Sequence, residues 1–285
     1  MKTFTLLLSC IDRPGIVATV SSFIHQAGLN ILESNQFGDP KTGRFFMRVA
    51  LTTADASVEV NQGDLKEKFK SISDSFEMDW QIFDMSVNTP AIIMLSKFDH
   101  CLVDLLYRCR TGTLKMDIAA VISNHDTSRE LVARENIPFH HIPVTPDTKQ
   151  AAEAQIKQII TDTGAELVIL ARYMQILSAE MTDSYPGQII NIHHSFLPSF
   201  KGAEPYSQAY HRGVKMIGAT AHYVTPNLDE GPIIAQQVVP VRHDMSVENM
   251  IGAGQENEQS VMARAVRAHT EHRILLNEGK TVVFD

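Results

Sequence analysis

The chain has 285 residues, of which 44% are hydrophobic and 20% are charged, and its formal net charge is -8. This composition is typical of a globular protein and excludes a disordered or fibrous chain, and the length favours two domains. The charge excludes a strongly basic, nucleic-acid-binding chain, and no apolar stretch approaches the ~20 residues of a membrane helix.

The N-terminus and the cysteines indicate where the protein works. The apolar run at residues 4–8 is too short for a signal peptide, and Asp12, Arg13 and Pro14 follow it at once. The three cysteines form no CxxC pair and leave one thiol unpaired, which fits a reducing compartment. We therefore expect a cytoplasmic protein with neither a membrane nor a nucleic acid as its partner.

Residues 1–86 are expected to form one small α/β domain. The helix at residues 15–26 carries apolar side chains at helical spacing, and Gly28 suits the position that often ends a helix. The expected elements are strand 4–9, helix 15–26, strands 29–37 and 44–52, helix 61–76 and strand 78–87. The order βαββαβ predicts a ferredoxin-like sheet with both helices on one face.

Residues 87–90 read as a linker, after which the pattern changes. From residue 91 to residue 285, strands alternate with helices, which predicts a Rossmann-like, doubly wound and mostly parallel sheet. The expected strands are 91–96, 117–123, 139–142, 167–170 and 189–192, and the expected helices are 101–110, 128–135 and 149–162. Strands 217–224 and 233–239 should pair as an antiparallel edge, and a long helix over 247–276 should follow.

A polar pair stands at the end of an apolar strand in the second domain. Asn191 and His193 are two residues apart, so both side chains lie on the same side of that strand. Ligands of open α/β sheets bind beyond the carboxyl ends of the strands, so the pair faces an expected cleft. Asp229 could approach His193 and hold its imidazole in one tautomer. Each residue alone has an ordinary structural explanation, and the prediction rests on the three together.

Twelve histidines raise the alternative of a metallohydrolase. Neither an HExxH motif nor another standard zinc spacing is present, and adjacent histidines such as His193 and His194 should point to opposite faces of a strand. We therefore expect no metal site and no bound cofactor.

Two motifs resemble known families. Residues 191–198, Asn-Ile-His-His-Ser-Phe-Leu-Pro, followed by Asp229 within Leu-Asp-Glu-Gly-Pro, are similar to the folate-dependent formyltransferase family. Residues 12–17, Asp-Arg-Pro-Gly-Ile-Val, together with the βαββαβ order, resemble an ACT domain. The resemblance covers essentially the whole chain and implies an ACT-type regulatory domain over 1–86 and a formyltransferase-like catalytic domain over 91–285. That combination implies an enzyme of one-carbon metabolism and purine biosynthesis that hydrolyses 10-formyltetrahydrofolate to formate and tetrahydrofolate.

The resemblance also implies roles for individual residues. Asn191 would donate a hydrogen bond to the formyl oxygen, and Asp229 would orient His193. His193 would handle the proton that passes between water and the folate nitrogen, and whether it acts first as base or acid stays open. The family's folate-binding loop corresponds to residues 170–178, which implies folate contacts from Gln175, Ile176, Leu177 and Asp229. Transferase relatives usually carry Arg where Gln175 stands.

Water is the expected acceptor of the formyl group. Relatives that formylate glycinamide ribonucleotide carry a Gly-rich turn after the first strand of this domain, whereas residues 96–101 lack glycine and include Asp99. Relatives that formylate initiator tRNA carry an additional C-terminal domain, and this chain is acidic. Two alternatives stay open: formyl transfer to glycinamide ribonucleotide, and a non-catalytic regulator that binds amino acids and folate.

ACT domains commonly bind small amino acids between copies, so the resemblance implies a homo-oligomer with an effector such as glycine or methionine. The corresponding segments supply Asp12, Gly15, Asn30 and Ile31. The free N–H groups where the first helix begins at Gly15, together with Asn30, would hold the carboxylate of the amino acid. A dimerisation module without a ligand is the alternative.

Overall fold

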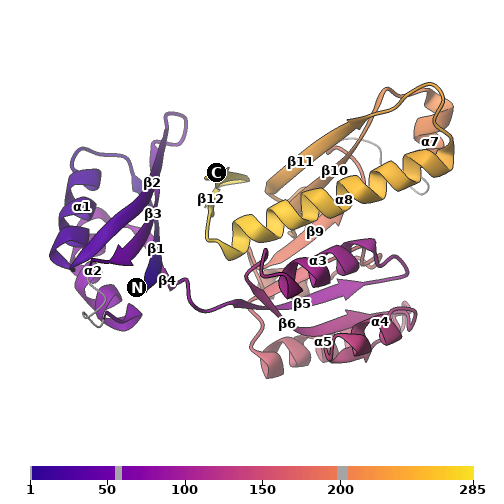
Figure 1. Cartoon of the computed structure of the whole chain (residues 1–285), viewed down its shortest axis with the longest axis horizontal. Helices are drawn as coiled ribbons and strands as arrows, with labels where there is room; N and C mark the ends of the chain where they lie inside the picture. The colour runs from indigo at the N-terminus through magenta and orange to yellow at the C-terminus, as the bar shows by residue number, and fades with distance from the viewer. Residues whose placement is uncertain (1, 55–59, 198–204) are drawn as a thin grey trace. The chain divides into compact units, whose positions relative to one another are not determined.

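The computed structural model describes residues 2–54, 60–197 and 205–285. The chain divides into two compact units (Figure 1). Unit 1 comprises Met1–Asn88 and Glu271–Asp285, and unit 2 comprises Thr89–Thr270. The break between them falls inside the predicted linker. The C-terminal end differs from the prediction, because Glu271–Asp285 folds with unit 1 and not with the predicted catalytic domain.

Unit 1 is built on a four-stranded antiparallel sheet. Its strands lie in the order β2-β3-β1-β4, with bounds β1 (Thr3–Ile11), β2 (Leu29–Asp39), β3 (Arg44–Thr53) and β4 (Asp79–Asp84). Helices α1 (Ile16–Gln26) and α2 (Gln62–Phe76) pack on one face, where the alternate residues Phe4, Leu6 and Leu8 of β1 enter the core. The predicted βαββαβ order is confirmed.

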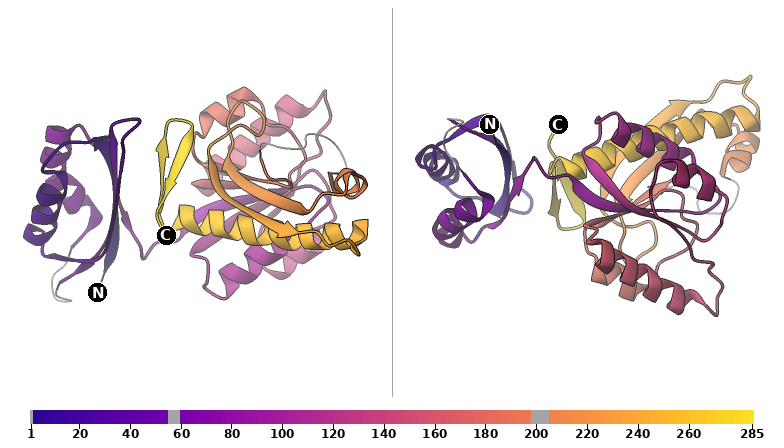
Figure 2. Two further views of the ribbon diagram at one scale, coloured as in Figure 1. Left: turned by 90° about the horizontal axis from the view of Figure 1, so that it is seen from above. Right: turned by 60° about the horizontal axis from the view of Figure 1, so that its bottom comes forward.

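A C-terminal hairpin packs on the other face of this sheet (Figure 2). Leu275 and Phe284 contact Phe46 of β3 there. The hairpin consists of β12 (Ile274–Asn277) and β13 (Lys280–Val283), which pair antiparallel. It covers an apolar surface that the two helices, both on the opposite face, leave open.

The prediction of one helix over residues 247–276 is therefore wrong. Helix α8 (Val247–Thr270) ends earlier, and His272 takes a left-handed φ of 50°. The turn of the hairpin contains Glu278, with φ 54°, followed by Gly279. A two-residue loop that ends in glycine and separates two apolar runs can indicate a hairpin, and the sequence analysis predicted no element there, beyond the expected helix end at Leu276.

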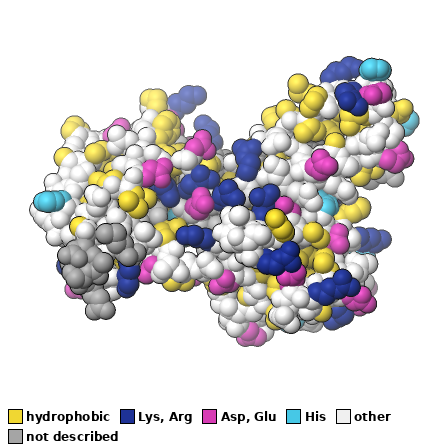
Figure 3. All heavy atoms as spheres, in the orientation of Figure 1, with side chains coloured by type: hydrophobic (Ala, Val, Ile, Leu, Met, Phe, Trp, Pro, Cys, Tyr) yellow, Lys and Arg dark blue, Asp and Glu magenta, His cyan; other side chains and the backbone are white. Residues whose placement is uncertain are grey.

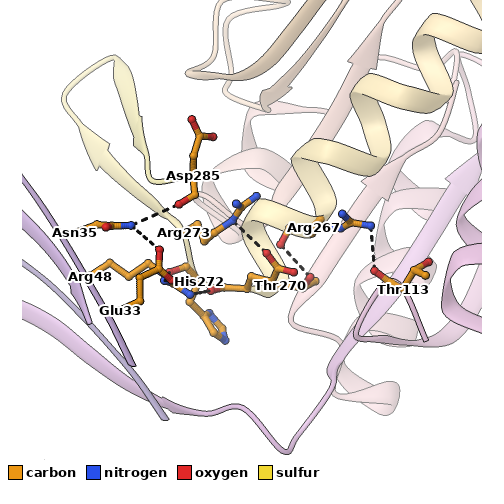
Figure 4. A network of polar contacts seen from close by, with 10 residues as sticks. Glu33, Asn35, Arg48, Thr113, Arg267, Thr270, His272, Arg273 and Asp285 are labelled. Carbon is orange, nitrogen blue, oxygen red and sulfur yellow. Dashed lines mark hydrogen bonds and ion pairs between the residues drawn. The ribbon is translucent and has the colours of Figure 1, made fainter. Parts of the chain in front are cut away.

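Arg48 ties the start of the hairpin to the sheet of unit 1. Its guanidinium donates to the backbone carbonyls of Glu271 and His272, at 3.2 and 3.1 Å, and to the Glu33 carboxylate of β2 at 3.1 Å (Figure 4). The His272 ring stacks on Phe83 of β4, with ring centres 3.4 Å apart. Because the buried guanidinium of Arg48 donates hydrogen bonds to two backbone carbonyls, it holds the chain in place directly after the end of α8.

Unit 2 contains a seven-stranded sheet in the order β11-β10-β9-β8-β5-β6-β7. The strands are β5 (Thr89–Leu95), β6 (Met116–Ser123), β7 (Phe139–His141), β8 (Leu167–Leu170), β9 (Ile189–His193), β10 (Met216–Tyr223) and β11 (Ile233–Pro240). Strands β5 to β9 pair in parallel, and β10 and β11 form an antiparallel edge. Both the doubly wound sheet and its antiparallel edge confirm the prediction.

Helices cover both faces of the sheet in unit 2 (Figures 1 and 2). Helices α3 (His100–Arg110) and α8 pack against each other, and α5 (Lys149–Thr163) buries Ile156 and Ile160 in a core with β5, β6 and β8. The remaining helices are α4 (Arg129–Arg134), α6 (Ala179–Ser184) and α7 (Pro205–Arg212). The sequence analysis did not predict α6 and α7, which are short.

No helix in the described ranges is long and apolar enough to cross a membrane. Acidic and basic side chains are interspersed on the face in Figure 3. The absence of a nucleic-acid partner stays a prediction.

His269 on α8 should make the protein less stable in acid. Burial lowers the pKa of His269 to about 4, and its Nδ1 lies 2.8 Å from the Tyr223 hydroxyl. An unfolded chain would protonate this imidazole near pH ~6.5, so the unfolded state gains a proton as the pH falls from there toward 4 while the folded state does not. We expect the free energy of unfolding to fall over that window, by up to roughly 3 kcal/mol from this residue.

The measurement is the melting temperature at pH 7 and pH 5, for wild type, His269→Gln and the exposed-residue control His243→Ala. The decrease in melting temperature between pH 7 and pH 5 should be smaller in His269→Gln than in wild type, and it should be unchanged in His243→Ala. An equal loss in all three proteins would contradict the prediction.

Candidate functional site

The three predicted catalytic residues come from one strand and one loop of unit 2. Asn191 and His193 lie at the carboxyl end of β9, and Asp229 lies in the loop between β10 and β11. All three line one cavity of about 330 Å³. Residues predicted from distant parts of the sequence are thus brought together. Pro198, the last residue of the motif that begins at Asn191, lies outside the described residues.

Asp229 faces the imidazole of His193. The Oδ1 atom of Asp229 lies 3.4 Å from Nδ1 of His193, and both side chains are largely buried. Contact with His193 lowers the pKa of Asp229 against the opposing effect of burial, so the carboxylate stays ionised. Asp229 has φ 58°, an uncommon conformation for a residue with a side chain, which places local strain at the site.

The other ring nitrogen of His193 is available for chemistry. Its Nε2 is buried and has no hydrogen-bond partner in the part of the chain that the structure describes. With Nδ1 directed at the carboxylate, the neutral imidazole carries its proton on Nδ1 and a lone pair on Nε2. This is the tautomer that a general base requires at Nε2.

His222 is a member of the site that the sequence analysis missed. It lies opposite Asn191 on β10, and its Nε2 is 3.2 Å from the amide nitrogen of Asn191. Its Nδ1 is 2.9 Å from the backbone carbonyl of Tyr223 and donates to it, so Nε2 accepts from Asn191. Burial lowers the pKa of His222, which keeps it neutral for this role. The only signal for it was a histidine at the end of a strand that pairs with β9.

His194 contradicts the expectation that adjacent histidines point to opposite faces. Its ring stacks on that of His193, with ring centres 5.0 Å apart and planes inclined by 18°. Strand β9 ends at His193, so the alternation of a strand no longer applies to the next residue. Burial, with Arg172 and His193 nearby, lowers the pKa of His194 to about 4, so it is neutral at pH 7.

The predicted folate loop follows β8 and lines the same cavity. Gln175, Ile176 and Leu177 all contribute to its wall, as do Leu228 and Asp229. Ile176 and Leu228 are 60% and 56% exposed, so they offer apolar surface that a flat ring could cover. The predicted folate residues are therefore placed together, and their contacts with a ligand stay a prediction.

Two buried polar residues anchor this loop. The Ser96 hydroxyl accepts from the backbone N–H of Met174 at 2.9 Å, one residue before Gln175. Glu153 of α5 accepts from the backbone N–H of Ser178 at 2.8 Å and also from its hydroxyl. Both ends of the loop are held, so the cavity wall is formed before a ligand binds.

One group of potential metal ligands occurs among the described residues, and it differs from the catalytic set. It consists of His100, Cys101 and Glu258. Arg172 and Tyr206 already engage the Glu258 carboxylate, and burial raises the pKa of the Cys101 thiol far above neutrality. A protonated thiol and an arginine-paired carboxylate do not favour a metal ion, and the expectation of no metal stays a prediction.

The four predicted effector residues are exposed, and one chain does not bring them together. Asn30 pairs through β3 with the start of β1, whereas Asp12 follows the end of β1. Asp12 and Gly15 therefore lie at one end of the sheet, and Asn30 and Ile31 lie at the other. At about 3.3 Å per residue, the two ends of β2 are roughly 30 Å apart.

Comparisons with known proteins agree with this architecture. The Formyl transferase family model matches residues 91–266, and the ACT domain model matches residues 4–62. The fold and the site thus define a formyl transferase domain joined to an ACT domain.

The relatives identify the family more closely. A formyltetrahydrofolate deformylase of Corynebacterium sp. (strain P-1) is 47% identical over 279 residues, covering 98% of this chain and 97% of its own length. The crystal structure of a formyltetrahydrofolate deformylase from Pseudomonas syringae pv. tomato has a TM-score of 0.96 and 47% identity, covering 100% of this chain and 95% of that one. The chain belongs to the formyltetrahydrofolate deformylase family.

A third likeness is confined to part of the chain. The crystal structure of glycinamide ribonucleotide transformylase 1 from Symbiobacterium toebii is 31% identical with a TM-score of 0.65. It covers 70% of this chain and 95% of its own.

Proposed function

We propose that the protein hydrolyses 10-formyltetrahydrofolate to formate and tetrahydrofolate. The observation that carries the proposal is the arrangement of His193 in the same cavity as the Asn191 amide. His193 faces Asp229 through Nδ1, and its Nε2 has no hydrogen-bond partner among the described residues. Relatives of that name, similar over nearly the full chain, support the same reaction. The transformylase likeness stops short of the full chain, which favours hydrolysis over formyl transfer to glycinamide ribonucleotide.

His193 supplies the proton transfers. Its Nε2 takes a proton from the attacking water, and the same nitrogen returns it to the folate nitrogen when the C–N bond breaks. The ionised Asp229 stabilises the imidazolium that forms in between and fixes the ring orientation. A positioned acid–base group of this kind accelerates a reaction by roughly 10²–10⁴.

Asn191 stabilises the charge that develops on the formyl oxygen. One hydrogen of its amide nitrogen is donated to His222, which fixes the side chain and leaves the second hydrogen for the substrate. A donor fixed in advance needs no reorganisation when the oxyanion forms. His222 is therefore a positioning residue for Asn191.

The direct test follows formate release from 10-formyltetrahydrofolate by the purified protein, with no other acceptor present. We expect continuous turnover that is insensitive to prior chelation. Tight folate binding without formate release would instead support the non-catalytic regulator, and activity lost on chelation and restored by a metal would support a metallohydrolase.

We also propose that unit 1 binds glycine or methionine at an interface between two copies. Among the described residues, strand β2 is an edge strand of its sheet and pairs only with β3. Antiparallel pairing of β2 with its copy would bring the Gly15 end of one sheet beside the Asn30 end of the other, joining the two halves that one chain keeps apart. The protein would then be a homo-oligomer.

The effector proposal is tested by titrating formate release with each amino acid. We expect one of them to change the rate, and Asn30→Ala to weaken that response, whereas Gln36→Ala on the same strand should not. Point substitutions are preferable to removal of residues 1–88, which would expose the apolar hairpin. A rate that neither amino acid alters would remove the proposal.

We further propose that the enzyme works in the cytoplasm, in the one-carbon metabolism that supplies purine biosynthesis. Its three cysteines are free thiols, as expected in a reducing compartment. Fractionation of cells with an antibody to the protein tests the location, and formate and purine levels after its removal test the metabolic role.

A further inference from the structure

The sheet of unit 2 has a topological switch point between β5 and β8. From β5 the chain moves outward through β6 and β7, and it then crosses back to β8 and β9 on the other side. Loops that follow β5 and β8 diverge at such a point, and the space between them is where open α/β sheets bind ligands. Here the two loops are residues 96–99 and 171–178.

In this protein the two loops are joined by their own contacts. The backbone N–H of Ser96 donates to the carbonyl of Arg172 at 3.2 Å. The Arg172 guanidinium lies over the Phe98 ring, 5.5 Å from its centre. Arg172 has φ 67°, so the chain holds an arginine where glycine would be unstrained.

A buried carboxylate from α8 completes this cluster. Glu258 is 1% exposed, and it accepts from Arg172 at 3.3 Å, from Tyr206 at 2.9 Å and from His100 Nε2 at 2.9 Å. Burial would raise the pKa of Glu258, but these three contacts together lower it. The charge of Arg172 is thus neutralised inside the protein, where it could not remain unpaired.

The cluster of Phe98, His100, Arg172 and Glu258 adjoins the reacting groups. Arg172 and His194 both line the 330 Å³ cavity that contains His193. The described residues that line this cavity include none from residues 96–100 and none from α8. The cavity therefore borders the cluster at Arg172.

We propose that this cluster determines the acceptor by occupying the space in which an amine nucleophile would bind, so that only water reaches the formyl carbon. The inference rests on the proposed deformylase function. With water, a C–O bond forms, the C–N bond to folate breaks, and the proton lost by water goes to the folate nitrogen. A primary amine would form a C–N bond by the same proton path, so the chemistry of His193 does not exclude an amine acceptor. The amine must therefore be excluded by restricted access to the formyl carbon.

The test measures the partition between the two acceptors. Protein is incubated with 10-formyltetrahydrofolate and excess glycinamide, and formate and N-formylglycinamide are quantified together by mass spectrometry. The ratio of the two products does not depend on the absolute rate, so a slower variant remains informative. Wild type should form formate and no N-formylglycinamide above the enzyme-free control.

Two independent variants open the cluster. Arg172→Gly with Glu258→Gln removes the charge pair as a unit, suits the left-handed φ of residue 172 and keeps a polar group for Tyr206 and His100. Phe98→Ala removes a ring that is 48% exposed, so it should not compromise folding. Each should raise N-formylglycinamide to roughly tenfold or more above the enzyme-free control, the scale on which pocket contacts discriminate substrates.

Tyr223→Phe is the matched control, because it removes a buried hydrogen bond to α8 outside the cluster. It should keep the wild-type product ratio. The inference is overturned if wild type already formylates glycinamide, if folded cluster variants keep the wild-type ratio, or if Tyr223→Phe changes it equally. A wild type that releases no formate would instead refute the proposed function.

Discussion

Replacing His193 with alanine is expected to lower kcat for formate release by roughly 10²–10⁴. The substitution removes Nε2, which has no protein partner in the described residues and lies in the cavity where substrate would bind. KM should change little, because the wall formed by residues 175–177 remains. The measurement is steady-state formate release over a range of folate concentrations.

Asp229→Ala and the double variant show whether the two residues act as a unit. If Asp229 works by orienting His193 and stabilising its charge, Asp229→Ala should lower kcat only slightly further in a protein that already carries His193→Ala. Full additivity of the two losses would contradict that role. His243→Ala, an exposed histidine of unit 2, is the control for the substitution itself and should keep wild-type kcat.

Asn191→Ala should lower kcat by roughly 10²–10³, the usual cost of losing one donor to an oxyanion. The loss should appear in kcat more than in KM, because the hydrogen bond strengthens as charge develops on the formyl oxygen. His222→Ala removes the group that fixes the amide and should cause a smaller loss in the same parameter. Steady-state kinetics of both variants, measured side by side, provide the comparison.

An increase in KM alone for Asn191→Ala would contradict this role, because it would mean that the amide binds the ground state as strongly as the transition state. If His222→Ala were as inactive as Asn191→Ala, the histidine would have a direct role in place of the positioning role.

The sequence predicted those parts of the fold and site that depend on periodicity within one segment. Strand β8 was predicted at its observed bounds, because its run of large aliphatic residues begins directly after Glu166 and ends at Leu170. Asn191 and His193 share one side of β9 for the same reason. The residues alone left the approach of Asp229 to His193 as one possibility, and the family resemblance supported it, since spacing along the chain does not show which loop folds back over a strand. Their catalytic roles stay predictions.

The parts that were missed depend on contacts between distant segments. His222 joins the site through the register of β10 against β9, which no local pattern specifies. Glu258 lies in a largely polar stretch of α8, and its burial depends on Arg172, 86 residues away. The predicted helix ran on through Leu276 into the first strand of the C-terminal hairpin, and no element was predicted beyond it, because the hairpin's apolar residues cover the face of a sheet that forms at the other end of the chain.

That hairpin has a consequence for synthesis in the cell. The sheet of unit 1 is complete once residue 84 has emerged from the ribosome, yet the strands that shield its second face emerge only after residue 270. At translation rates of roughly 5–20 residues per second, Phe46 and its apolar neighbours remain uncovered for on the order of ten seconds or more. Chaperones are therefore most needed while the first unit is nascent. A ribosome that stalls late in the message leaves a chain whose exposed apolar face favours aggregation.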